Sequence, residues 1–237
     1  MSEQLRGGII AAGEGRRLRE DGFGVPKPLV SVGGVPLLES VIGNFVSVGI
    51  GSITAIVNDD HRQCVDWASG RFGALDLRFI VKTTASSLES FLTVLRHARP
   101  GPLLVSTVDA WCPRDEFAAF VAAARRRPAD AVVLGVTPLV ADERPLWARL
   151  GTDGRVTELG GRDGDAVTAG LYLIPERLRG VEPPPGLARL RDFLGWLARG
   201  GEPVYAEVVP TVVDVDRGSD VALAESLVPQ VAKVCGL

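Results

Sequence analysis

The chain has 237 residues, of which 46% are hydrophobic and 23% are charged, so it is long enough to bury a sizeable core. Its formal net charge of −3 argues against a general nucleic-acid or membrane-surface binder, because such proteins usually carry a basic excess. Three cysteines and two histidines, none of them at metal-ligand spacing, indicate neither a disulfide framework nor a zinc site. We therefore expect no nucleic-acid partner and no membrane partner.

The first residues and the apolar runs of the chain bear on its cellular location. The chain begins Met-Ser-Glu-Gln, without the basic region and apolar stretch of a signal peptide. No apolar run approaches the ~18 residues of a transmembrane helix. The sequence predicts a cytoplasmic protein and leaves open whether it forms a homodimer.

Apolar segments typical of strands alternate with segments of helical spacing. The expected strands are residues 7–12, 53–57, 77–81, 103–107, 131–137, 147–150, 156–159, 170–174, 204–209 and 212–216. The expected helices are residues 37–48, 64–69, 87–97, 115–126, 187–200 and 220–228, with Asp115 and Asp220 as caps of two of them. Residues 147–159 indicate a hairpin. This order predicts an α/β protein with three α/β/α layers and a Rossmann-like, mixed, mostly parallel sheet.

The first strand runs into a glycine-rich, doubly basic turn, Gly13-Glu14-Gly15-Arg16-Arg17. Backbone N–H groups at the carboxyl end of a buried strand suit anionic oxygens. Lys27 follows between two prolines and adds another positive charge. The third glycine of the dinucleotide-binding fingerprint is missing, because Leu18 stands there, and the chain has no Gly-Lys-Ser/Thr of a P-loop. The segment predicts a triphosphate-binding loop of another kind.

A longer pattern continues through this region. It reads Ala-Ala-Gly-x-Gly-x-Arg-Leu, then Pro-Lys-Pro-Leu, then Val-Gly-Gly-x-Pro-Leu-Leu before a helix. This pattern resembles the NTP-transferase superfamily of sugar-phosphate and MobA-like nucleotidyltransferases. The resemblance implies a nucleotide-diphospho-sugar transferase-like fold and an enzyme that transfers NMP from an NTP to a phosphorylated small molecule, releasing pyrophosphate. The acceptor would be a sugar 1-phosphate, a polyol or cyclitol phosphate, or choline phosphate.

The resemblance also implies an organisation of the chain. We expect a single domain over residues 1–237, in which residues 1–110 mainly bind the nucleotide and residues 111–237 mainly bind the acceptor. Within the glycine loop the implied nucleotide contacts are Ala12, Gly13, Gly15 and Arg16. Arg17 and Lys27 would be catalytic, with Lys27 on the α-phosphate. Fixed cations are needed there because attack by one phosphate on another brings two anions together.

Aspartates in two other segments suggest a Mg²⁺ site. Asp109 follows the strand expected at residues 103–107, where a carboxylate would project into the same crevice. The segment Asp214-Val215-Asp216 resembles the late Asp-x-Asp segment of the family, and alternation puts both carboxylates on one side of an extended strand. A hard cation that bridges phosphates needs one or two carboxylates. The resemblance implies Asp109 and Asp216 as metal ligands, with Asp214 as a neighbour or substitute.

The remaining candidate residues carry weaker signals. Ser86 and Ser87 precede the helix at residues 87–97 and are implied nucleotide contacts, although Ser87 suits an N-cap equally well. The segment around Gly170 is similar to the Ala-Gly-Ile-Tyr strand of the family, whose glycine lies by the acceptor. We expect residues 142–149 on the acceptor side, where Arg149 either binds the incoming phosphate or lies in solvent.

Three alternative interpretations stay open. The acceptor could be molybdopterin or another cofactor. The chain could be a catalytically silent nucleotide-binding module, because Val108-Asp109 and Arg217-Gly218 depart from the family's pattern. An NAD(P)-dependent Rossmann enzyme fits least well. The residue types do not identify the base of the nucleotide or the acceptor. They also leave open which member of each pair, Arg16/Arg17 and Asp214/Asp216, is functional.

Overall fold

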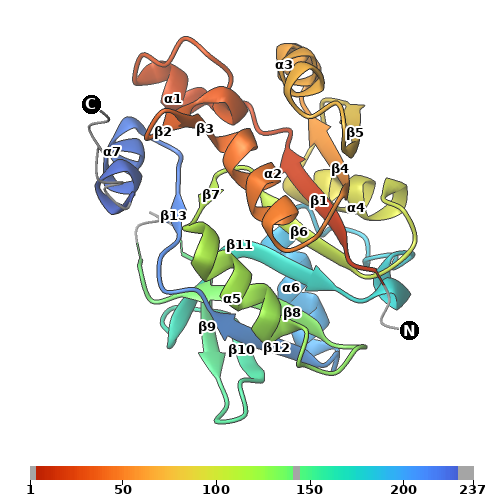
Figure 1. Cartoon of the computed structure of the whole chain (residues 1–237). Helices are drawn as coiled ribbons and strands as arrows, with labels where there is room; N and C mark the ends of the chain where they lie inside the picture. Colours follow the sequence, from red (N-terminus) through yellow and green to blue (C-terminus); the bar gives the residue numbers. More distant parts are fainter. Residues whose placement is uncertain (1–3, 141–144, 229–237) are drawn as a thin grey trace, which may run out of the picture.

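The computed structural model describes residues 4–140 and 145–228 (Figure 1). A nine-stranded sheet forms its centre. The strands of this sheet are β1 (Arg6–Ala11), β4 (Ser52–Val57), β5 (Asp76–Val81), β6 (Leu103–Thr107), β8 (Val132–Thr137), β9 (Trp147–Leu150), β10 (Val156–Gly161), β11 (Ala166–Ile174) and β12 (Val204–Val208). They follow the order β10-β9-β11-β6-β1-β4-β5, while β8 pairs with β11 and β12 outside this path.

The two halves of the sheet differ in direction. Strands β6, β1, β4 and β5 are all parallel. The first three are nearly continuous apolar runs, as expected for strands covered on both faces, whereas β5 is a partly exposed edge strand. Strand β11 then runs antiparallel to β6, β8 and β9, and β9 and β10 form the predicted hairpin. The predicted α/β class with a mixed sheet is confirmed.

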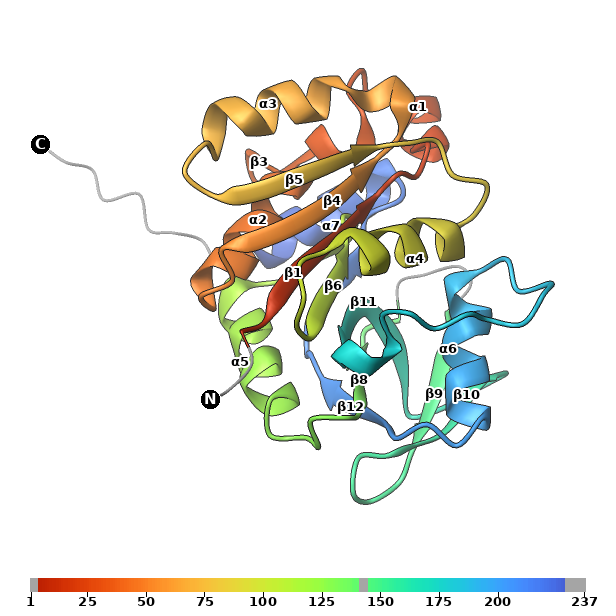
Figure 2. The same ribbon diagram turned by 90° about the vertical axis from the view of Figure 1, so that its right-hand side faces the viewer.

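Helices cover both faces of the sheet. They are α1 (Arg16–Glu20), α2 (Leu37–Ser47), α3 (Gln63–Arg71), α4 (Ser87–His97), α5 (Arg114–Ala124), α6 (Leu190–Arg199) and α7 (Gly218–Leu227). Figure 2 shows α4 and α6 on one side of the sheet and α3 and α5 on the other. This arrangement is the predicted three-layer architecture. No helix in the described part of the chain is long and apolar enough to cross a membrane.

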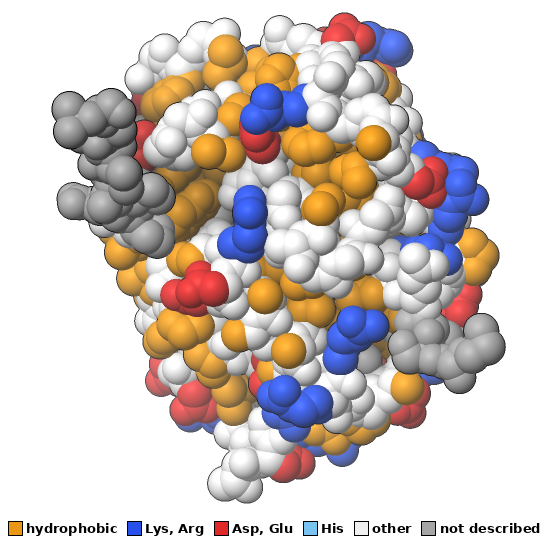
Figure 3. Space-filling model, viewed as in Figure 1, with side chains coloured by type: hydrophobic (Ala, Val, Ile, Leu, Met, Phe, Trp, Pro, Cys, Tyr) orange, Lys and Arg blue, Asp and Glu red, His pale blue; other side chains and the backbone are white. Residues whose placement is uncertain are grey.

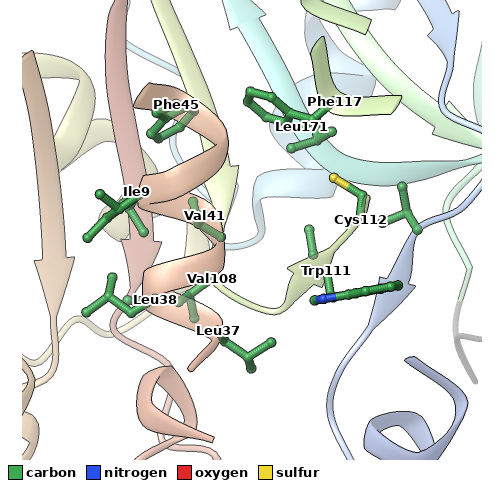
Figure 4. Packing of buried hydrophobic residues seen from close by; sticks show 14 of the residues in the cluster. Ile9, Leu37, Leu38, Val41, Phe45, Val108, Trp111, Cys112, Phe117 and Leu171 are labelled. Atoms are coloured by element: carbon green, nitrogen blue, oxygen red, sulfur yellow. The ribbon is translucent and has the colours of Figure 1, made fainter. Parts of the chain in front are cut away.

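Two apolar clusters, one on each face, hold the layers together. On one face Phe45 of α2 and Phe117 of α5 meet edge to face with ring centroids 5.7 Å apart, and Leu171 of β11 packs near them (Figure 4). On the other face the ring centroids of Phe91 of α4 and Phe193 of α6 lie 5.6 Å apart. Outside these clusters, charged side chains are scattered among apolar ones on the face seen in Figure 3.

Short elements differ most from the sequence-based expectation. The strand expected at residues 212–216 is only β13 (Val213–Asp214), which pairs with β7 (Ala110–Trp111) instead of joining the main sheet. The helix expected to start at residue 187 begins at Leu190. A hairpin of β2 (Ser31–Val32) and β3 (Val35–Pro36) was not expected, because two-residue strands carry no periodicity.

The predicted caps are partly wrong. Helix α5 begins at Arg114 after an extended Pro113, so Asp115 lies inside the first turn and cannot be the N-cap. Its carboxylate complements the helix N-terminus without a capping bond. Asp220 also lies inside its helix but does cap it, because its Oδ2 accepts hydrogen bonds from the backbone N–H groups of Asp216 (2.9 Å) and Arg217 (2.7 Å).

Candidate active site

The glycine loop and Asp109 meet at one edge of the sheet. Ile10 of β1 pairs with Thr107 of β6, and the backbone N–H of Val108 donates to the carbonyl of Ile10 over 2.9 Å. The two chain segments that follow these parallel strands therefore leave the sheet side by side. This is the edge where ligands bind in α/β sheets.

Gly15 brings the loop close to Lys27. It adopts a left-handed conformation (φ +61°) at the start of α1, and a Cβ atom at this position would lie 2.8 Å from the Cβ of Lys27. Lys27 stands between Pro26 and Pro28 in the sequence and is the first residue of the 3-10 helix η1 (Lys27–Leu29). Only 7% of its side chain is exposed. The backbone thus packs the lysine stem under the glycine loop and fixes the direction of its ammonium group.

The Lys27 ammonium group joins residues from distant parts of the chain. Nζ donates to Oδ2 of Asp109 over 2.5 Å and also to Oδ1 of Asp216. The other oxygen of Asp216, Oδ2, accepts a hydrogen bond from Nη1 of Arg17 over 3.0 Å. The structure therefore brings four of the predicted site residues into one hydrogen-bonded network.

Electrostatics keep Lys27 and Asp109 ionised. Burial alone would lower the pKa of Lys27, but the carboxylates of Asp109, Asp216 and Asp214 outweigh it and raise that pKa above its ordinary value. Burial raises the pKa of Asp109, yet the charge of Lys27 and the hydrogen bonds from Lys27 and Thr107 bring the net pKa below its ordinary value. At neutral pH the lysine is protonated and the carboxylate is charged.

Three carboxylates converge beside the lysine. Asp109, Asp214 and Asp216 each offer one oxygen, and these oxygens lie within 4.8 Å of one another. The small β13–β7 ladder sets Asp214 opposite Ala110, and the backbone N–H of Val215 donates to the carbonyl of Asp109 over 3.0 Å. A cluster of carboxylate oxygens is the donor set that Mg²⁺ prefers, so these residues fit the predicted ion.

A first cavity of about 480 Å³ opens over the glycine loop. Its lining includes every residue predicted to contact the nucleotide, to act on the phosphates or to bind the metal: Ala12, Gly13, Gly15, Arg16, Arg17, Lys27, Ser86, Ser87, Asp109 and Asp216. It also includes Asn58 and Thr83, which the sequence analysis did not single out. Asn58 donates to the carbonyl of Ala12 over 3.3 Å and accepts from the hydroxyl of Thr83 over 3.1 Å. A polar residue directly after a buried parallel strand is the signal that could have identified Asn58.

The two predicted serines have different structural roles. Ser86 is the N-cap of α4, and its Oγ accepts from the backbone N–H of Glu89 over 3.1 Å. Ser87 is the first residue of the helix, and its Oγ accepts from the backbone N–H of Leu190 over 3.1 Å. Ser87 therefore connects α4 to the start of α6 and is not the cap.

A second cavity of about 290 Å³ adjoins the first. Ser87, Thr107 and Asp109 line both cavities, so these residues form the boundary between them. Gly170 also lines the second cavity, with φ +68°, and a Cβ atom there would lie 2.5 Å from Oγ1 of Thr107. The cavity thus lies beside Gly170, where the acceptor was expected.

Arg149 is not among the residues that line either cavity. Its guanidinium pairs with Glu158 of β10 over 3.4 Å and with Asp163, which follows β10, over 2.5 Å. The neighbouring residues Asp142, Glu143 and Arg144, also expected on the acceptor side, lie outside the described part of the chain. Two other arginines, Arg189 and Arg191, line the second cavity instead. The sequence analysis missed them because only tertiary structure places the start of α6 there.

The comparisons with known proteins agree with this geometry. The chain belongs to the MobA-like NTP transferase domain family, whose model matches residues 7–166. The matched residues include the glycine loop, Lys27 and Asp109. The resemblance stated from the sequence motifs is confirmed.

Individual proteins share low sequence identity with this chain or match only part of it. The bifunctional IPC transferase and DIPP synthase of Rubrobacter xylanophilus is 29% identical over 251 residues, covering 95% of this chain and 52% of that protein. The 2-aminoethylphosphonate cytidylyltransferase of Lancefieldella rimae is 39% identical over 100 residues, or 40% of each chain. The chain thus spans about half or less of the length of these relatives. The inositol-1-phosphate CTP transferase structure from T. maritima superposes with a TM-score of 0.80 at 16% identity, covering 98% of this chain and 100% of that one, and has the same fold.

Proposed function

We propose that this chain is a Mg²⁺-dependent nucleotidyltransferase that transfers NMP from an NTP to a phosphorylated small molecule and releases pyrophosphate. The observation that carries the proposal is the pair of cavities that meet at Asp109, beside the charged network of Lys27, Arg17 and Asp216. The first cavity would hold the donor nucleotide and the second the acceptor. Residues 1–110 would supply most of the donor half, and residues 111–237 most of the acceptor half.

The chemistry needs positive charge and alignment. One phosphoryl oxygen of the acceptor attacks the α-phosphorus, the bond from that phosphorus to the bridging oxygen breaks, and pyrophosphate leaves with the electron pair. The attacking oxygen is already ionised at neutral pH, so no protein base is required. Lys27 would neutralise the α-phosphate and Arg17 the departing phosphates, while backbone amides of Ala12, Gly13 and Gly15 orient the triphosphate.

The carboxylates fit a divalent cation. Asp109 and Asp216, with Asp214 beside them, would hold Mg²⁺. When bound, the ion would neutralise charge on phosphoryl oxygens as a Lewis acid. Arg16, Ser86 and Ser87 line the donor cavity and would contact the nucleotide from its other sides.

The names of similar proteins favour CTP as the donor. One relative is named for cytidylyl transfer and a neighbouring structure for CTP transfer. Their named acceptors differ, since one is an aminoalkylphosphonate and the other an inositol phosphate. Both acceptors present a tetrahedral –PO₃ group to the nucleotide, and we propose this group as the common requirement of the acceptor cavity.

Pyrophosphate release tests the proposal. The purified chain is incubated with Mg²⁺ and CTP, UTP, GTP or ATP, together with inositol 1-phosphate, 2-aminoethylphosphonate, choline phosphate or glucose 1-phosphate. We expect one pyrophosphate per molecule of nucleotidylated product with CTP, and none after EDTA treatment. Asp109→Asn should lower turnover by about 100-fold or more, because it weakens the charge arrangement at the reacting phosphorus.

Matched controls separate function from folding. Asp130→Asn removes an exposed carboxylate that lines neither cavity and should leave turnover unchanged. Nucleotide binding is followed separately by the melting temperature, which rises when a ligand binds the native state. A chain that binds CTP but turns over no acceptor would be the silent nucleotide-binding module instead. An Asp109→Asn variant with full turnover would contradict the site assignment.

A further inference from the structure

The acceptor cavity has a distinctive charge arrangement. Asp109 and Asp214 line it, and a –PO₃ group that enters it must approach these two carboxylates. Among the described residues of its lining, the positively charged side chains are Arg189 and Arg191. An anionic acceptor needs compensating charge within the same cavity, and these two guanidinium groups are the groups that can supply it.

The local fold holds both arginines at the cavity. They flank Leu190, the first residue of α6. Leu190 is buried in the apolar cluster that α4 and α6 share, so the backbone on either side of it is anchored. A guanidinium group presents parallel N–H donors that match two oxygens of a –PO₃ group, and it stays charged at every working pH.

The hydroxyl of Tyr172 is influenced by the charges of both Arg191 and the carboxylates. Tyr172 lines the acceptor cavity, and burial raises the pKa of its hydroxyl above the ordinary value. The charges of Asp109 and Asp214 raise that pKa further, whereas the charge of Arg191 opposes them. Arg191 thus lies within electrostatic reach of the same small region as the two carboxylates.

Ser87 ties the arginines to the donor cavity. Its Oγ accepts the backbone N–H of Leu190 over 3.1 Å, a contact between residues 103 positions apart. Ser87 also lines both cavities. The hydrogen bond therefore fixes where the arginine pair lies relative to the nucleotide, which makes Ser87 a positioning residue.

We propose that Arg189 and Arg191 bind the –PO₃ group of the acceptor and align one of its oxygens with the α-phosphorus of the nucleotide, with Ser87 setting their position. The inference deepens the proposed function and rests on it. It assigns to these two residues the phosphate-binding role that the sequence left open for Arg149. The substrate class is a small phosphomonoester or phosphonate, and the test below distinguishes the two sources of the –PO₃ group.

Steady-state kinetics test the arginines. Arg189→Ala, Arg191→Ala and the double variant are assayed for pyrophosphate release at saturating CTP, with inositol 1-phosphate in one arm and 2-aminoethylphosphonate in the other. Each single variant should raise the KM of the acceptor about tenfold, since a hydrogen bond between charged groups is lost. The KM of CTP should change less than about twofold, and the double variant should be weaker than either single one.

The matched control is Arg199→Ala, which removes an exposed arginine from the last turn of the same helix and should leave both KM values unchanged. Ser87→Ala should raise the KM of the acceptor, and Ser87→Thr should restore it because the hydroxyl returns. A double variant whose acceptor KM stays within about twofold of the wild type would overturn the proposal. An equal loss of CTP affinity in the arginine variants would also overturn it.

A binding measurement covers the case of a chain without turnover. Calorimetry follows the binding of inositol 1-phosphate and 2-aminoethylphosphonate to protein loaded with Mg²⁺ and α,β-methylene-CTP. If the wild type binds an acceptor and the double arginine variant does not, the arginine site stands even where the proposed transfer fails. If the wild type binds neither compound, or the double variant binds as well as the wild type, the arginine site is wrong.

Discussion

At the scale of single residues, Lys27 replaces part of the charge that a divalent ion would supply. Its ammonium group lies between oxygens of Asp109 and Asp216, two residues of the predicted metal site. Three carboxylates gathered without a cation would repel one another, so the lysine stabilises the ligand-free site. If these carboxylates hold a divalent cation as proposed, we expect the lysine to compete with it for the same oxygens in the nucleotide-free site.

Replacing Lys27 with methionine separates its two roles, because the side chain keeps its length and loses its charge. We expect turnover to fall by about 100-fold or more, since the cation at the α-phosphate is missing. We expect Mn²⁺ to bind the nucleotide-free variant more tightly than the wild type, since the carboxylates lose their internal cation. Electron paramagnetic resonance of free Mn²⁺ measures this affinity. Weaker or equal Mn²⁺ binding would contradict the competition, and Lys82→Met, which removes an exposed ion pair with Glu89, is the matched control.

Gly15 and Gly13 make a second matched pair at this scale. Gly15→Ala forces a side chain into a left-handed conformation and to within 2.8 Å of the Lys27 Cβ, whereas a Cβ at Gly13 would meet nothing within 4 Å. Gly15→Ala should lower the free energy of unfolding by about 1–2 kcal/mol or more, and Gly13→Ala by much less. Chemical denaturation measures both. Equal destabilisation would show that the loop conformation at Gly15 is not required.

At the scale of elements, the start of α7 determines where Asp216 lies. Asp220 holds the backbone N–H groups of Asp216 and Arg217, and Asp21 at the end of α1 accepts from the N–H of Gly218 over 2.8 Å. These hydrogen bonds connect the segment before α7 to the first turn of the helix, and the start of α7 to the segment that follows α1. The position of a predicted metal ligand thus depends on helix capping.

Asp220→Ala tests this dependence. The loss of the cap should lower the free energy of unfolding by about 1 kcal/mol. Because the backbone of Asp216 is released, the Mg²⁺ concentration needed for half-maximal turnover should rise as well. Asp115→Ala, in the first turn of α5, is the control and should leave the Mg²⁺ requirement unchanged. An Asp220→Ala variant that is less stable but has a normal Mg²⁺ requirement would contradict the positioning role.

The same scale shows what could be predicted from the sequence. The strands β1, β4 and β6 were predicted because parallel strands buried on both faces are continuous apolar runs, and the partly exposed edge strand β5 was predicted from its shorter apolar segment. The hairpin β2–β3 and helix α1 were missed because they are too short to show a period. The late strand was predicted too long, since its residues pair only with the two-residue β7.

The site was predictable only in part, for a related reason. The glycine loop and Lys27 are close in sequence, so their pattern carries the family resemblance. Asp109 could be placed at the same edge because it follows a buried strand, and the family resemblance then implied it as a metal ligand. Asp216 was placed with them only through that resemblance. Arg189 and Arg191 follow a proline-rich loop, and only the packing of α6 against α4 brings them to the second cavity.

Across the whole molecule, one apolar cluster buries two cysteine thiols from distant parts of the chain. Burial raises the pKa of Cys64 to about 11 and that of Cys112 to about 12. Both therefore stay protonated at pH 8, and burial limits their reactivity. In a Cys235→Ser variant, a thiol reagent should modify these two residues only as fast as the protein opens, and Mg²⁺–CTP should slow the reaction. Immediate modification of either thiol in the folded variant would contradict the buried positions.

We propose that the two adjoining cavities, divided at Asp109, are the donor and acceptor halves of one transfer site. A crystal structure of the wild type with Mg²⁺, α,β-methylene-CTP and a phosphorylated acceptor tests it most directly. We predict the triphosphate over the glycine loop, the metal between Asp109 and Asp216, and the acceptor –PO₃ group beside Arg189 and Arg191. A triphosphate bound outside the first cavity, or a metal held without Asp109, would contradict the claim.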